Sequence, residues 1–237
     1  MAIERAGHFL VDVDLAGRVS VGIKTDQLQA CVQEAKNKKA DGVFGSPSFG
    51  FMQDNLDFLS ELPKLTKIWF WDVRLRDVTG VYELSALKHF GIHPKRPGID
   101  FGRLRAIEEL VWEFNEKDSG LEALSELKML HIWHFKPKSK SFAGLSVSTS
   151  VKQLQINWAN PRSLDGLPAL PSLQRLEIHH CRNLETVDAL VDIAPNIEHL
   201  VVSACGKISG ADAVIKQLPK LKHAYVQNKL LVSSEIA

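Results

Sequence analysis

A short apolar pattern recurs along most of the chain and limits the folds that it can adopt. In LQRLEIHHC, which begins at Leu173, leucine or isoleucine fills positions one, four and six. Similar segments begin at residues 40, 65, 87, 107, 127, 151, 173, 197 and 221, with all spacings between 20 and 25 residues. Apolar and polar residues alternate from position three to position seven, which predicts a short strand with one buried face. We expect strands near residues 67–70, 89–92, 109–112, 129–132, 153–156, 175–178, 199–202 and 223–226.

A second pattern fills the segments between these strands. Leucines recur at every third residue, as in 56, 59, 62 and 65 and again in 164, 167, 170 and 173. A step of three suits short 3₁₀ turns better than long α-helices. Each repeat can bury its leucines only against its neighbours, so the pattern predicts an α/β solenoid of stacked strand-and-turn units.

The extended pattern L-x-x-L-x-L-x-x-C-x-x-L, which runs from Leu173 to Leu184, resembles the leucine-rich repeat family. The resemblance covers roughly residues 40–228. It implies a horseshoe with a parallel β-sheet on its concave face and short helical or 3₁₀ returns on its convex face. LPxL turns such as LSELPKL and LDGLPALPSL are most similar to the bacterial and phosphatase-regulator branches, whose repeats have about 22 residues.

The first 39 residues do not repeat and are expected to form an N-terminal cap, followed by a repeat domain at residues 40–237. Two alternating runs around Ala16 and Gly17 predict a β-hairpin. The segment TDQLQACVQEAKNKK predicts an amphipathic helix with Thr25 or Asp26 as its N-cap. The short C-terminal segment LLVSSEIA is expected to leave the last strand poorly covered.

The composition excludes several functional classes. The 237 residues carry 29 basic and 28 acidic side chains, a net charge of +1, which argues against a general nucleic-acid binder. The acidic residues near the N-terminus do not fit a signal peptide, and no apolar run is long enough to span a membrane. The three cysteines do not form a disulfide framework. We therefore expect a cytoplasmic protein that binds neither membranes nor nucleic acids.

The segment RLEIHHC places two histidines directly before Cys181. Cys181 and Cys205 both occupy position nine of a repeat, where a buried, unbonded thiol fits the pattern. Zinc requires three or four converging ligands, and adjacent strand residues diverge, so no metal or other cofactor is expected. A cross-strand metal site built from His131, His134, His179 or His180 remains the alternative.

Histidine and tryptophan concentrate at positions three, five, seven and eight, which the repeat places on the concave face and its rim. Eight of the nine histidines and four of the five tryptophans lie there, whereas about one histidine would do so by chance. The high strand propensity of aromatic residues explains part of this enrichment. Clustered aromatic side chains that the core does not need are typical of an interface. The predicted partner-binding residues are Trp69, Trp71, His93, Glu113, His131, Trp133, His134, Asn157, Trp158, Glu177, His179 and His180.

Two basic loops, at residues 93–98 and 136–141, flank this face and are either simply solvated or steer an acidic partner. The second loop is followed by SFAGLSVSTS, which interrupts the leucine pattern and predicts a local irregularity.

These features favour a protein–protein interaction module that binds one partner protein on its concave face. An immunity or inhibitor protein that neutralises a toxin or enzyme fits such a chain, and a phosphatase-regulator-like scaffold is the alternative. No phosphate-binding loop, G-x-S-x-G or H-E-x-x-H motif occurs, so an enzyme with catalytic residues is not expected. Acid–base pairing of His131 with Glu177, or of His179 with Glu113, is the less favoured enzymatic interpretation.

Overall fold

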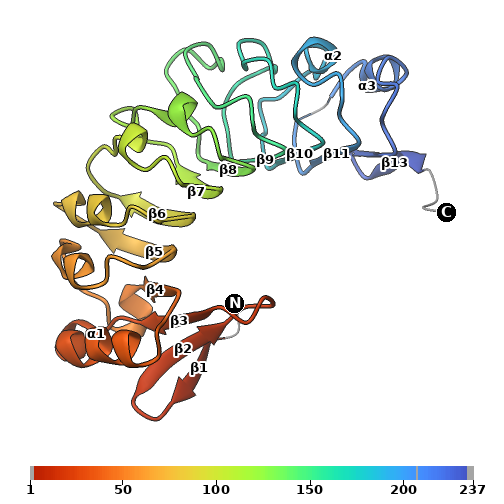
Figure 1. The fold of residues 1–237 in the computed structure, drawn as a ribbon. Coiled ribbons are helices and arrows are strands. Elements are labelled where there is room, and N and C mark those ends of the chain that lie inside the picture. The colour runs from red at the N-terminus through yellow and green to blue at the C-terminus, as the bar shows by residue number, and fades with distance from the viewer. Residues whose placement is uncertain (1–2, 207, 234–237) are drawn as a thin grey trace. The chain divides into compact units, whose positions relative to one another are not determined.

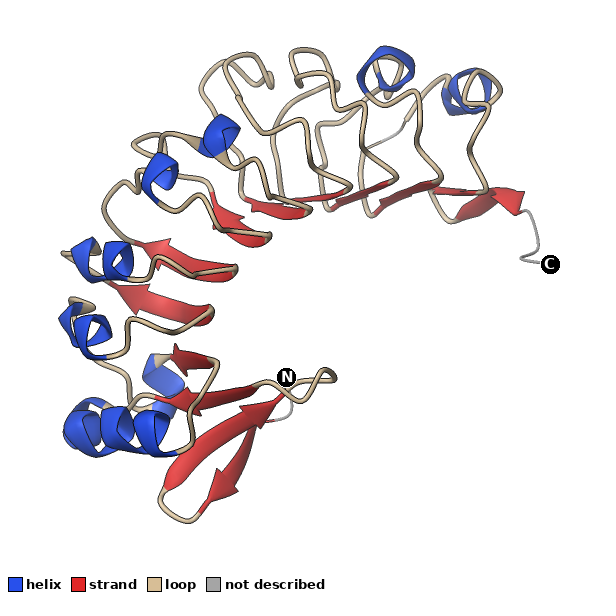
Figure 2. Ribbon diagram, viewed as in Figure 1, coloured by secondary structure: helices blue, strands red, loops and turns tan. Residues whose placement is uncertain are grey.

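The computed structural model describes residues 3–206 and 208–233. It separates into two compact units, Met1–Leu110 with Lys117–Ser119, and Val111–Glu116 with Gly120–Ala237. Within each unit the strands lie side by side in chain order (Figure 1). In each unit the strands form one layer, and the helices lie on one side of this layer (Figure 2).

The first unit begins with antiparallel strands and continues with parallel ones. Its elements are β1 (Ile3–Ala6), β2 (Phe9–Val13), β3 (Val19–Gly22), η1 (Thr25–Gln27), α1 (Leu28–Asn37), β4 (Gly42–Gly45), η2 (Pro47–Phe49), η3 (Asp57–Glu61), β5 (Lys67–Arg74), η4 (Thr79–Glu83), β6 (His89–Lys95) and η5 (Phe101–Arg103). The predicted hairpin is confirmed as β2 and β3, and the weak repeat copy at residue 40 forms β4. Strand β1, which pairs with β2, was not predicted.

The predicted helix is also confirmed, but its predicted cap is wrong. Helix α1 begins after Gln27, and no side chain caps it. The Thr25 hydroxyl instead accepts a hydrogen bond from the backbone N–H of Met52 at 2.7 Å. Thr25 therefore links the residues before helix α1 to the loop that follows η2.

The second unit consists of parallel strands with short returns between them. Strand β7 (Glu109–Glu113) is divided between the units at Leu110. The elements that follow are η6 (Leu121–Ala123), β8 (Met129–Trp133), β9 (Gln153–Asn157), β10 (Arg175–His179), α2 (Leu190–Ile193), β11 (His199–Ser203), α3 (Ala211–Ile215), β12 (His223–Val226) and β13 (Lys229–Ser233). All eight predicted strands are confirmed. The segment at residues 141–150, which was predicted to be irregular, contains no helix or strand.

The chain reverses after β12, and β13 pairs with it in the antiparallel direction. The expectation that the last repeat strand is poorly covered is therefore wrong, because residues 229–233 occupy its free edge. The final residues of LLVSSEIA, 234–237, lie outside the described part of the chain. The proposed boundary between a cap at 1–39 and a repeat domain at 40–237 stays a prediction.

The core of the second unit is a ladder of equivalent side chains. Leu130, Leu154, Leu176 and Leu200 lie in register on neighbouring parallel strands, and each is at most 1% exposed. Burying one such side chain contributes about 1.5–3 kcal/mol. The tight leucine spacing in the returns explains why most of the short helices are 3₁₀ helices of three to five residues. Trp112, the one tryptophan that does not lie at positions three, five, seven or eight, occupies the core position six and is 3% exposed.

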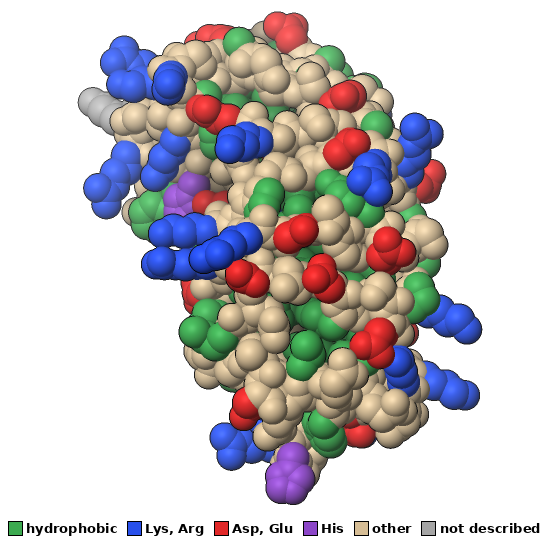
Figure 3. Space-filling model, turned by 90° about the vertical axis from the view of Figure 1, so that its left-hand side faces the viewer, with side chains coloured by type: hydrophobic (Ala, Val, Ile, Leu, Met, Phe, Trp, Pro, Cys, Tyr) green, Lys and Arg blue, Asp and Glu red, His purple; other side chains and the backbone are tan. Residues whose placement is uncertain are grey.

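The side chains on the side of the molecule that Figure 3 shows are mixed in character. Lysine and arginine are interspersed with aspartate and glutamate, and hydrophobic side chains are scattered between them.

Among the described residues, none of the helices combines the length and apolar character needed to cross a membrane.

The predicted basic loop at residues 93–98 is only partly a solvated turn. Lys95 belongs to β6, and the Arg96 side chain is 1% exposed. Its guanidinium donates two hydrogen bonds of 2.7 Å to the Asp118 carboxylate, which is also 1% exposed and accepts from the backbone N–H of Ile99. Arg96 therefore cannot steer a partner, because Asp118 neutralises it inside the first unit.

We predict that Asp118→Ala destabilises the first unit by about 3–5 kcal/mol, because it leaves a buried guanidinium without its carboxylate. Urea-induced unfolding followed by circular dichroism measures the loss. Arg76→Ala is the matched control, since the Arg76 side chain is 88% exposed in its ion pair with Asp54 and its loss should leave the midpoint nearly unchanged. Equal shifts for the two variants would contradict a structural role for the buried pair.

Candidate functional site

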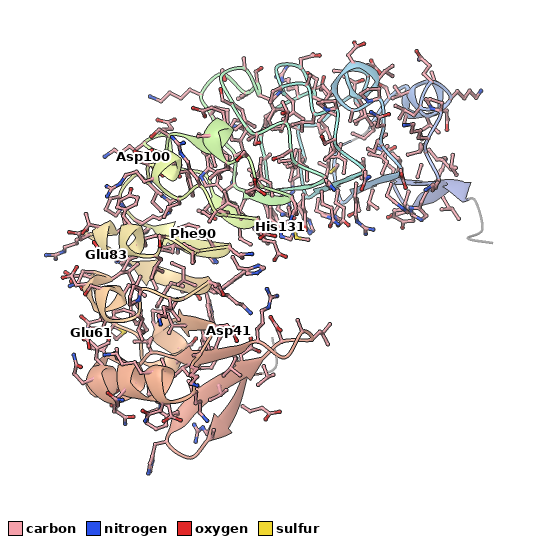
Figure 4. The ribbon with its side chains drawn as sticks, viewed as in Figure 1. Asp41, Glu61, Glu83, Phe90, Asp100 and His131 are labelled. Carbon is pink, nitrogen blue, oxygen red and sulfur yellow. The ribbon has the colours of Figure 1, made fainter. Side chains whose placement is uncertain are left out.

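Positions three, five and seven of each repeat project from the sheet on the side opposite the returns, and we call this side the open face. The strand residues at positions four and six are buried, whereas those on the open face are mostly half-buried. Figure 4 shows Glu61, Glu83 and Asp100 among the returns of the first unit, and His131 at the strand layer of the second unit. The predicted interface residues fall on both units, so each unit has its own candidate surface.

The open face of the first unit carries an aromatic cluster around Trp71. The Trp71 ring stacks on Phe44 with centroids 6.2 Å apart and meets the edge of Phe49 at 5.6 Å. Trp69 meets the ring of His93 at 6.4 Å. Phe44 is only 1% exposed. Part of the Trp71 surface is therefore used for packing, and Phe44 and Phe49 are members of the cluster that the repeat pattern did not reveal.

The N-terminal hairpin adds charged groups to this surface. Arg18 bonds Asp14 at 2.7 Å and also contacts the Nε2 atom of His89, while His89 Nδ1 lies 2.8 Å from a Glu109 carboxylate oxygen. Lys67 lies 3.5 Å from Asp14. Burial opposes ionisation of Asp14, but hydrogen bonds from Arg18 and Ala16 lower its pKa to about 2.

A cavity of about 650 Å³ lies beside this charged cluster, lined by Asp12, Val13, Asp14, Leu15, Ala16, Arg18 and Lys67. Hairpin residues and β5 meet here through tertiary contacts, so no sequence motif marks the cavity. Sequence reasoning missed it for that reason.

The open face of the second unit is organised around Glu177. One carboxylate oxygen accepts from Arg175 Nε at 2.6 Å, and the other lies 3.0 Å from His179 Nε2. The second ring nitrogen of His179 lies 2.6 Å from the Ser203 hydroxyl on the next strand. Burial opposes ionisation of Glu177, but hydrogen bonds from His179 and Arg175 outweigh it and lower the pKa of Glu177. The network fixes the orientation of four polar side chains, those of Arg175, Glu177, His179 and Ser203.

Position eight forms the rim of this surface, where the chain leaves the strand with a left-handed backbone. His134, Trp158 and His180 have φ angles of 52°, 57° and 57°. Their N–H groups each donate to the strand of the next repeat, which holds the unusual conformation. The Trp158 and His180 rings stack at 4.2 Å with an interplanar angle of 11°, and Trp158 is 37% exposed. The rim therefore presents a fixed, accessible aromatic platform.

Two histidine–carboxylate pairs form on this face, and one of them excludes a pair proposed from the sequence. His134 Nδ1 lies 2.9 Å from Glu113, and His179 bonds Glu177. Both ring nitrogens of His179 are used by Glu177 and Ser203, so the proposed pairing of His179 with Glu113 is wrong. The proposed pairing of His131 with Glu177 stays a prediction. Within the described residues, no three or more histidine, cysteine, aspartate or glutamate side chains are arranged to hold a metal ion, so the alternative site at His131, His134, His179 and His180 is not assembled.

The prediction that Asn157 contacts a partner is wrong, because the residue is only 3% exposed. Its amide nitrogen donates to the Ile132 carbonyl at 3.5 Å, and its amide oxygen accepts from Gln155 at 3.0 Å. Its backbone carbonyl accepts from the N–H of His134 at 2.9 Å. Asn157 therefore supports the rim and does not face a partner.

Cys181 is buried and has a free thiol, as predicted. Cys205 also has a free thiol but is only half-buried, so the prediction that it is buried is wrong. The next repeat covers Cys181, and the Gly206 N–H bonds its carbonyl at 3.2 Å. A hydrogen bond between the two thiols, with burial, raises the pKa of Cys181, and the same bond lowers the pKa of Cys205.

Comparisons with solved structures agree with this architecture. An internalin, InlF from Listeria monocytogenes, superposes with a TM-score of 0.58 at 16% identity, over 87% of this chain and 58% of the internalin chain. The chain thus spans 58% of that relative's length. This chain has a leucine-rich-repeat fold.

Two further structures are similar at lower scores. The plant peptide hormone receptor RGFR1 in complex with RGF2 has a TM-score of 0.38 at 13% identity, over 92% of this chain and 36% of the receptor. The functional domain of InlJ from Listeria monocytogenes has a TM-score of 0.27 at 12% identity, over 78% of this chain and 62% of that domain. No family model and no curated protein sequence matches the chain.

We predict that Cys205 is the first of the three thiols to react with iodoacetamide in the native protein. It is half-buried and its pKa is lowered, whereas burial raises the pKa of Cys31 and Cys181 is covered. Since one pKa unit changes the thiolate fraction about tenfold, the rates should differ by roughly 10-fold or more. Peptide mass spectrometry after timed labelling identifies the site, and equally fast labelling of Cys181 would disprove the assignment.

Proposed function

We propose that this chain is a protein–protein interaction module that binds its partner on the open face of the second unit. The observation that supports this most directly is the arrangement around Glu177. Arg175, His179 and Ser203 are held by short hydrogen bonds on a half-exposed surface that the leucine ladder does not need. Side chains that are already ordered lose less entropy when a partner binds, so more of the contact energy appears as affinity.

Trp133 and Trp158 are the proposed anchors on this surface. Trp133 ends β8 on the open face, half-buried, and its ring lies 6.1 Å from that of His134. Trp158 is the more exposed of the two and is fixed by its stack on His180. Tryptophans at the centre of an interface often contribute a large share of the binding energy. Trp71 is a weaker candidate than expected, because Phe44 and Phe49 already cover part of it.

The finer part of the proposal is that one partner protein, such as a toxin or an enzyme, is neutralised by this surface in the cytoplasm. Broad sheet faces of solenoids are well suited to covering a single folded partner. The three free cysteines support a reducing compartment. The leucine-rich-repeat fold seen in the internalin supports a binding role in general.

We predict that Trp133→Ala and Trp158→Ala each weaken partner binding by about 2–4 kcal/mol, or roughly 30- to 1,000-fold, without unfolding the protein. The partner is first identified by affinity purification from the source cells and mass spectrometry. Isothermal titration calorimetry then gives the affinity, and circular dichroism the melting temperature.

Lys216→Glu is the matched control, because Lys216 is exposed beside the return helix α3 and should not affect binding. Normal binding by both tryptophan variants together with lost binding by Lys216→Glu would place the interface on the return side. Unfolding of both tryptophan variants would show that these side chains belong to the core.

A further inference from the structure

A chain of hydrogen bonds on the open face has the order of groups that activates a serine. Ser203 Oγ lies 2.6 Å from His179 Nδ1, and His179 Nε2 lies 3.0 Å from Glu177 Oε2. The three residues come from β10 and β11, where His179 and Ser203 are direct partners in the parallel register. We propose that Ser203, His179 and Glu177 form a hydrolytic triad that attacks activated carboxylic esters. This proposal rests on its own geometry and not on the proposed partner binding.

The partners of His179 determine where its proton lies. The lowered pKa of Glu177 keeps that carboxylate ionised, so it accepts a hydrogen bond and the Nε2 atom of His179 carries the proton. The Nδ1 atom then has a free lone pair and accepts from the Ser203 hydroxyl. This is the tautomer that a general base needs, and Glu177 is the positioning residue that selects it. Arg175 fixes Glu177 in turn, with a 2.6 Å hydrogen bond.

A donor for the developing oxyanion follows Ser203 directly in the chain. The N–H groups of His134, Trp158 and His180 donate to carbonyls of the next strand, but within residues 3–206 and 208–233 no backbone carbonyl accepts from Ala204 at the same repeat position. Ala204 has a φ angle of 51°. In serine hydrolases, the N–H of the residue after the nucleophile is one of the usual oxyanion donors. The proposal assigns that role to the Ala204 N–H.

The proposed reaction proceeds through an acyl-serine. Ser203 Oγ forms a bond to the ester carbonyl carbon as its proton passes to His179 Nδ1. The bond to the alkoxy oxygen then breaks, and the departing alcohol takes the proton from His179. Water attacks the acyl-serine, again losing a proton to His179, and the carboxylic acid leaves as the serine is restored. No oxidant, reductant or other co-reactant is required.

Sequence reasoning did not reveal this arrangement because it follows no local motif. Glu177, His179 and Ser203 occupy positions five, seven and seven of two successive repeats. Only the parallel register of β10 and β11 brings the serine to the histidine.

The test uses a fluorophosphonate probe, which reacts with activated serines as the P–F bond breaks, fluoride leaves and an O–P bond forms. We expect the full-length protein to be labelled on Ser203, as identified by peptide mass spectrometry, and to hydrolyse p-nitrophenyl acetate. Ser203→Ala should abolish both reactions. His179→Ala should slow both by about 10²–10⁴-fold, the usual contribution of a general base.

Glu177→Gln tests the positioning role, with rates between those of the wild type and His179→Ala. Glu177→Asp, which restores a carboxylate, should recover part of the lost rate. Ser209→Ala, which alters a serine that bonds the Glu185 carbonyl, is the matched control and should react at the wild-type rate. Absence of labelling at Ser203 in the wild type, or equal labelling rates in the wild type and folded His179→Ala, would overturn the proposal.

Discussion

The structure depends on one constraint: a single repeat cannot bury its own leucines. Leu154 is covered because Leu130 and Leu176 lie in register on both sides of it. The same dependence applies to the isoleucines and valines at position six, such as Ile156 and Ile178. Stability in such a stack is a sum of neighbour contacts, so every repeat must keep positions one, four and six apolar. The remaining strand positions are released from that requirement.

The outward-facing strand positions, which do not have to be apolar, explain how one surface can be both ordered and functional. Side chains alternate along a strand, so each residue that faces the core is followed by one that faces outward. In the second unit these outward residues form a chain of hydrogen bonds from Arg175 through Glu177 and His179 to Ser203. At the rim, the left-handed backbone at position eight holds Trp158 against His180. The same fixed geometry underlies both proposals, partner capture and serine activation, and the two are tested separately.

The sequence was sufficient to predict the parts of the fold that depend on local periodicity. Alternation and spacing located all eight repeat strands, and the leucine step of three indicated short 3₁₀ returns. Features that depend on long-range packing were missed. They include the pairing of β13 with β12, the buried ion pair of Arg96 with Asp118, and the packing of Phe44 and Phe49 on Trp71. The burial of Asn157 belongs with them, because the pattern counts its position as outward, whereas its amide bonds the Ile132 carbonyl and the Gln155 side chain.

The central claim is that, along one strand, the residues that face the core provide stability and the residues that face outward provide the surface chemistry. Two neighbouring residues of β9 test this claim most directly. Leu154 faces the core and is 1% exposed, whereas Gln153 beside it is exposed on the open face. Urea-induced unfolding should show a loss of about 2–5 kcal/mol for Leu154→Ala and a change within about 0.5 kcal/mol for Gln153→Ala. Equal losses for the two variants would contradict the account, because the open face would then contribute to the core.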